Sequence, residues 1–79
     1  MNNIIKQIRK EKGFSQQEFA TVAGVSSQTI FDIEHFNRKT INDNILKIIE
    51  QLGYDQEKLK KTYNDQRQQN QKEMLQQVK

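Results

Sequence analysis

The chain has 79 residues, with 13 lysines and arginines against 10 aspartates and glutamates, and its formal net charge of +3 suits a polyanionic partner without identifying one. A chain of this length forms one small domain, and its mean hydropathy of −1.00 indicates that part of it is a polar extension rather than core. The absence of cysteine excludes a disulfide scaffold and a thiolate zinc site, and the charges of Lys6, Arg9 and Lys10 exclude a signal peptide or membrane span there, so we expect a soluble cytoplasmic protein without a membrane partner.

Apolar residues recur at steps of three and four along a chain without proline, which predicts an all-α fold of five helices. The first helix carries Ile4, Ile5 and Ile8 on one side and ends at Gly13 in a left-handed conformation.

The second helix has two start signals. Ser15 and Glu18 match the S-x-x-E capping box, and Phe14 and Phe19 occupy the two positions of a hydrophobic staple. We therefore expect this helix to begin directly after Ser15.

The third helix repeats this arrangement, because Ser26 can cap it while Val25 and Ile30 form the staple. We expect it to run to about Phe36 and to stop at Asn37, since asparagine tolerates the left-handed region.

A fourth helix is predicted before Gly53, with either Thr40 or Asn42 as its cap, and a fifth is predicted from Asp55. The inward side of the fourth helix is expected to carry Ile45, Leu46, Ile48, Ile49 and Leu52. Tyr54 and Leu59 form the staple of the fifth.

The composition changes after residue 63. We divide the chain into a domain over 1–63 and a Gln-rich extension over 64–79, which is either disordered or a helix that pairs with another subunit. Its few apolar residues, and the last aromatic residue before it, are the predicted dimer contacts: Tyr63, Met74, Leu75 and Val78.

The two short helices between Ser15 and Glu34 meet at a glycine, with small and aliphatic residues at fixed positions around it. These residues are Ala20, Gly24, Val25, Ile30 and Ile33. The pattern resembles the helix-turn-helix of the lambda-repressor and Cro-like family over about Ile5 to Leu59. The resemblance implies a five-helix DNA-binding domain whose third helix enters the major groove.

The resemblance also implies a structural ion pair between Arg9 and Glu34, and a glutamine, Gln16, that clamps the DNA backbone. The chain departs from the family at Phe36 and Thr40, where a glycine and a proline are usual, so the loop after the third helix is expected to have its own shape.

If Ile30 and Ile33 face the core, the opposite side of the third helix is free to contact base pairs. The predicted base-reading residues on that side are Ser27, Gln28, Phe31, Asp32 and His35. The predicted phosphate contacts are Lys10, Gln16, Ser26, Arg38 and Lys39.

The sequence offers little for catalysis, because His35 is the only histidine and no glycine-rich phosphate loop occurs. We therefore expect no enzyme activity, no cofactor and no metal. The favoured function is sequence-specific binding of double-stranded DNA by a homodimeric transcription regulator that represses by occupying its operator. The alternative is a protein-interaction module, such as an antitoxin or adaptor, whose extension binds a protein partner.

Overall fold

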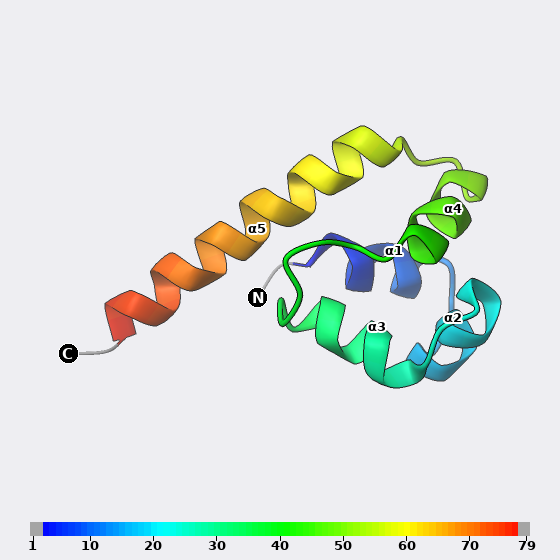
Figure 1. Ribbon diagram of the computed structural model, residues 1–79, viewed down its shortest axis with the longest axis horizontal. Coiled ribbons are helices and arrows are strands. Elements are labelled where there is room, and N and C mark those ends of the chain that lie inside the picture. The colour runs from blue at the N-terminus through cyan, green and yellow to red at the C-terminus, as the bar shows by residue number, and fades with distance from the viewer. Residues whose placement is uncertain (1–2, 78–79) are drawn as a thin grey trace.

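The computed structural model describes residues 3–77 and folds them into five helices (Figure 1). The helices are α1 (Ile4–Glu11), α2 (Gln16–Ala23), α3 (Ser27–Glu34), α4 (Asp43–Gln51) and α5 (Gln56–Gln77). No strand occurs in this part of the chain, which confirms the predicted all-α fold. None of these helices combines the length and apolarity needed to cross a membrane.

The helix starts are set by side chains that accept hydrogen bonds from the free N–H groups of the first turn. At α2 the capping box is complete: the Ser15 hydroxyl accepts from the Glu18 N–H at 3.0 Å, and the Glu18 carboxylate accepts from the Ser15 N–H at 2.9 Å. Donation from the Ser15 N–H to the carboxylate, followed by a smaller contribution from the Ser15 side chain, lowers the pKa of the Glu18 carboxyl. The Ser26 hydroxyl accepts from the Thr29 N–H at α3, as predicted.

The structure decides between the two caps left open for α4. Asn42 caps it, with its side-chain oxygen 2.8 Å from the Asn44 nitrogen, and Thr40 lies in the preceding loop. Asp55 caps α5 by accepting from the Lys58 N–H at 3.0 Å.

The end of α3 differs from the prediction. The left-handed residue is Phe36, with φ 58°, and not Asn37. The Phe36 N–H donates to the Ile33 carbonyl at 3.1 Å, and the Asn37 N–H donates to the Asp32 carbonyl at 2.8 Å. This pair of bonds closes the helix in a Schellman arrangement, which requires the left-handed conformation one residue before Asn37.

The five helices enclose one core, in which α2 packs on α3 and α5 packs on α1 and α4. The residues that fill it are Ile5, Ile8, Phe19, Ala20, Ala23, Ile30, Ile33, Ile41, Ile45, Leu46, Ile49, Leu59 and Tyr63. Ile48 and Leu52, predicted to face inward, are half-buried at its edge.

Tyr63 is a core residue, which corrects its predicted place at a dimer contact. Its side chain is almost fully buried, and its hydroxyl donates to the Arg38 carbonyl at 2.8 Å and lies 3.2 Å from the Ile33 carbonyl. Burial raises the pKa of the Tyr63 hydroxyl. Tyr63 thus holds α5 against the end of α3.

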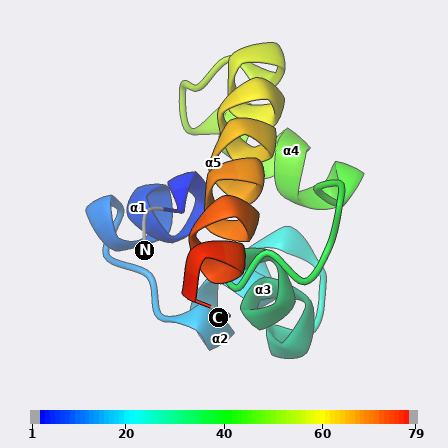
Figure 2. The same cartoon turned by 90° about the vertical axis from the view of Figure 1, so that its left-hand side faces the viewer.

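The C-terminal segment is helical through Gln77, because α5 continues without a break past residue 63. Gln66 still contacts the body, accepting from the Ile4 N–H at 2.7 Å. Beyond it α5 projects past the other helices, as Figure 1 shows from the side and Figure 2 along the helix. The division at residue 63 stays a prediction, since no change of structure marks it.

Candidate nucleic-acid interface

The candidate interface is built on the pair formed by α2 and α3. Gly24 joins them in a left-handed conformation, with φ 71°, which glycine adopts at little cost. Ala20 is buried between the helices, and its carbonyl accepts from the Val25 N–H at 3.0 Å. Ile30 and Ile33 are fully buried, so the side of α3 opposite to them faces solvent.

An ion pair fixes this helix pair to α1. Arg9 Nε lies 2.6 Å from Glu34 Oε2, and Arg9 Nη2 donates to Glu34 Oε1 at 3.0 Å. Arg9 also donates to the Phe14 carbonyl through Nη1 at 2.9 Å. The two side chains are 9% and 1% exposed, so losing one would leave a buried charge without compensation, at a cost of about 3–5 kcal/mol.

Gln16 is joined to the same pair. It is the first residue of α2 and is half-buried, and its amide nitrogen donates to Glu34 Oε1 at 3.1 Å. One of its two amide hydrogens is thereby used, which leaves the second for another acceptor.

The outer side of α3 carries the five residues predicted to read bases, and four of them contact one another in two pairs. Gln28 Nε2 donates to Asp32 Oδ1 at 2.9 Å. Asp32 Oδ2 lies 3.7 Å from Arg38 Nη2. A row of polar groups therefore runs from Gln28 to the loop after α3, with Ser27 exposed beside it.

Phe31 and His35 form a second unit on the same side. Their rings stack with centroids 3.9 Å apart, and His35 Nδ1 lies 2.8 Å from the Phe31 carbonyl oxygen. Phe31 remains 41% exposed. The stack presents an aromatic edge to solvent next to the polar row.

The remaining predicted phosphate contacts lie on three different elements. Lys10 is exposed on α1, and Arg38 and Lys39 are exposed in the loop after α3. Ser26 is the cap of α3, and its hydroxyl lies 3.0 Å from that of Thr29, so it already has partners within the protein.

The structure adds two connections that the sequence analysis missed. The bond between Gln28 and Asp32 joins residues four apart on one helix, a spacing at which side chains are neighbours, so the sequence held a usable signal. Asn3 is buried, caps α1 and donates to the Ile33 carbonyl at 3.0 Å, and its place just before an apolar stripe was the corresponding signal.

Among residues 3–77, no three side chains of histidine, aspartate or glutamate come together in a way that would hold a metal ion. His35, considered above for catalysis, instead contacts the Phe31 ring and carbonyl.

Comparison with known proteins gave one family. A model described as helix-turn-helix matches residues 5–55, which include all of α1 but its first residue, and the whole of α2, α3 and α4. Neither the comparison with curated proteins nor that with solved structures gave a match. The match covers more than half of the chain, and the chain therefore belongs to the helix-turn-helix family of DNA-binding transcription regulators.

Proposed function

We propose that this chain binds a specific double-stranded DNA operator as a homodimer and represses transcription by occupying it. The observation that carries the proposal is the solvent-facing side of α3, where a row of polar side chains and an aromatic edge are held in place by neighbouring residues. A major groove is wide enough to admit a helix and presents a different pattern of donors and acceptors for each base pair.

Gln28 is the proposed principal base reader. Its amide nitrogen gives one hydrogen to Asp32, so the second hydrogen and the amide oxygen remain for a base. One donor and one acceptor side by side match N7 and N6 of adenine. Ser27 and Phe31 are proposed to contact neighbouring positions, Phe31 through a thymine methyl group.

Contacts to phosphate are proposed to position α3 without specifying sequence. The α2 N-terminus supplies free N–H groups and the second amide hydrogen of Gln16. Lys10, Arg38 and Lys39 are exposed and carry the positive charge that this contact needs.

Repression by occupancy and dimerisation are inferred from what the described part of the chain offers. Residues 3–77 form one DNA-binding body and one projecting helix, so blocking access to a promoter is the action they can supply directly. One α3 reads only a few base pairs, and a second copy supplies the second half-site. Met74 and Leu75 are the exposed residues proposed for the dimer contact, and Val78 lies outside the described residues.

The proposal is tested by selecting bound duplexes from a random library and measuring affinity for the selected site by fluorescence anisotropy. Gln28→Ala is expected to cost about 1–3 kcal/mol and to relax preference at about one base position. Gln51→Ala, an exposed glutamine of α4, is the control and is expected to bind like the parent. Gln16→Ala is expected to weaken all sequences similarly.

An unchanged base preference in Gln28→Ala would show that α3 does not read bases as proposed. If no duplex is selected over competitor DNA, the alternative of a protein-interaction module gains support. Repression itself is tested by transcription in vitro from a promoter that contains the selected site, where added protein is expected to reduce the transcript only when the site is intact.

A further inference from the structure

The projecting part of α5 exposes the two large apolar side chains nearest its end. Met74 is 58% exposed and Leu75 is 74% exposed, whereas Leu59 and Tyr63 of the same helix are buried. The last turns of α5 project past α1 and α3 in Figure 1, and in Figure 2 this end of the helix faces the viewer. Nothing among the described residues covers this pair of side chains.

One side of α5 connects this apolar end to the body of the protein. Lys60, Asn64, Arg67, Gln71 and Met74 follow one another at steps of four and three, so they lie along one side of the helix. We call these five residues the α5 stripe. Two helices that pack along each other carry apolar residues at such steps, and in the α5 stripe only Met74 is apolar, so any apolar contact is confined to its end.

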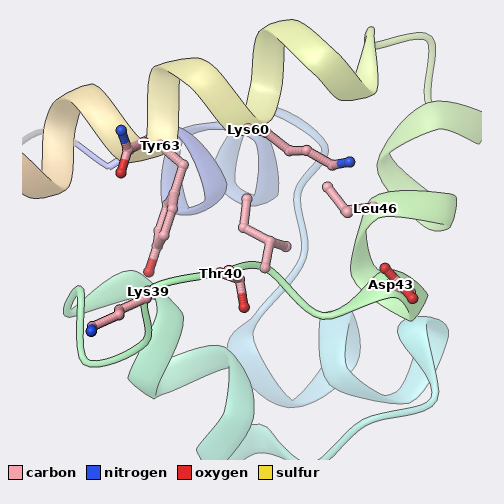
Figure 3. A pocket seen from close by; sticks show the side chains of 8 residues that line it. Lys39, Thr40, Asp43, Leu46, Lys60 and Tyr63 are labelled. Carbon is pink, nitrogen blue, oxygen red and sulfur yellow. The ribbon is translucent and has the colours of Figure 1, made fainter.

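The N-terminal end of the α5 stripe lies at a pocket of about 440 Å³ between α4, α5 and the loop after α3 (Figure 3). Ile41, Leu46 and Tyr63 provide its apolar lining, and Lys60 and Asn64 of the α5 stripe lie at its edge. One molecule thus carries both an open pocket with an apolar floor and a polar rim, and an exposed apolar pair, at the two ends of one side of α5.

We propose that these two features meet between copies of this chain, an inference that rests on the homodimer proposed above. The two α5 helices pack antiparallel along the α5 stripe, with the two-fold axis between Arg67 and Gln71. In this register Met74 of each copy lies opposite Asn64 of the other, at the mouth of the pocket, with Leu75 beside it. The contact is isologous, so both pockets and both apolar ends are covered at once.

The charges favour the antiparallel register. A parallel pair would place Lys60 against Lys60 and Arg67 against Arg67, which repel each other. The antiparallel pair places Arg67 opposite Gln71 instead.

Cross-linking tests the register, because the chain contains no cysteine that would interfere. Asn64→Cys and Met74→Cys are made as separate full-length proteins and oxidised alone and mixed. Mixing is expected to give a disulfide-linked dimer, whereas each protein alone is expected to remain uncross-linked. Cross-linking of either protein with itself, without the mixed product, would overturn the antiparallel register.

Sedimentation equilibrium of the full chain tests whether Met74 and Leu75 form the contact between the two copies. Met74→Ala combined with Leu75→Ala is expected to weaken dimerisation at least about tenfold, since both side chains lose their cover. Gln69→Ala combined with Gln76→Ala changes the opposite side of α5 and is expected to dimerise like the parent. A dimer of unchanged strength in the first variant overturns this surface but leaves the proposed homodimer intact. A parent chain that is monomeric even on its operator overturns both.

Discussion

Asp32 is an anion on the side of α3 proposed to face DNA, where it would repel phosphates. Its contacts give it a different role, since it accepts the Gln28 amide hydrogen at 2.9 Å and lies 3.7 Å from Arg38 Nη2. A glutamine amide can present either its NH₂ group or its oxygen to a neighbour. A carboxylate has no hydrogen to donate, so it can bond only to the NH₂ group. Asp32 thereby fixes which way the Gln28 amide points, and we infer that it is a positioning residue rather than a base reader.

We expect Asp32→Ala to lose most of the base preference that depends on Gln28, because the amide is then free to turn. The loss in discrimination is expected to be about 1 kcal/mol, the usual worth of one hydrogen bond. Affinities for the selected site and for a site with that base pair exchanged, measured by anisotropy at one salt concentration, give this value. Binding to unrelated DNA is expected to strengthen, since an anion has been removed.

Asp65→Ala removes the same charge from an exposed position on α5 and serves as the control. In a double-mutant cycle, Asp32→Ala is expected to have little further effect on base preference once Gln28 is alanine. Additive effects of the two substitutions would mean that Asp32 acts independently of Gln28.

At the scale of the element, α3 ends in a strained backbone conformation, and side-chain packing offsets the cost of that strain. Phe36 has a φ of 58°, which for a residue with a Cβ costs roughly 1–2 kcal/mol relative to glycine. Its ring is half-buried against Tyr63, with centroids 5.5 Å apart, and Tyr63 in turn bonds the Arg38 carbonyl. The strained residue therefore helps to join α3, its following loop and α5.

This balance predicts that Phe36→Gly is more stable than Phe36→Ala by about 1 kcal/mol. Both variants lose the contact with Tyr63, but only glycine relieves the left-handed strain. Urea unfolding monitored by circular dichroism gives the two free energies of unfolding. Alanine within a helix or strand is normally the more stable choice, so an alanine variant at least as stable as the glycine variant would contradict a left-handed Phe36.

The helix boundaries that the sequence predicted correctly depend on residues close together in the chain. The capping box of Ser15 and Glu18 spans three residues, so its pattern is complete in the sequence. The choice between Thr40 and Asn42 could not be made, because either side chain can accept an N–H. The left-handed Phe36 was missed, since the stop of α3 is fixed partly by packing against Tyr63, 27 positions later.

In the candidate site, too, the features set by nearby residues were predicted from the sequence and those set by distant contacts were not. The outward side of α3 followed from the inward spacing of Ile30 and Ile33, a local pattern. Arg9 and Glu34 are 25 residues apart, and their pairing was expected only from the family resemblance. The burial of Tyr63 was not predicted, because it depends on where α5 crosses the end of α3.

At the scale of the whole molecule, the net charge and the shape make different contributions to the proposed DNA binding. The net charge is only +3, so the general attraction to DNA is modest and orientation must come from the fixed surface of α2 and α3. The molecule measures 41 × 24 × 20 Å, and its long dimension reflects the projection of α5. The surface proposed for DNA and the helix proposed for pairing therefore belong to different parts of the fold.

If two copies bind one operator, their α3 helices must enter the major groove on the same side of the duplex. The half-sites are then expected about 10–10.5 base pairs apart, or at a multiple of that distance. Inserting about five base pairs between them turns one half-site to the opposite side of the duplex, so affinity should fall to that of a single half-site. Inserting about ten should restore the shared side and much of the affinity. Fluorescence anisotropy at constant salt measures the affinities for the parent operator and for the two insertions. A duplex carrying one intact half-site is the control. Equal affinity for both insertions and for the parent operator would mean that the copies bind independently.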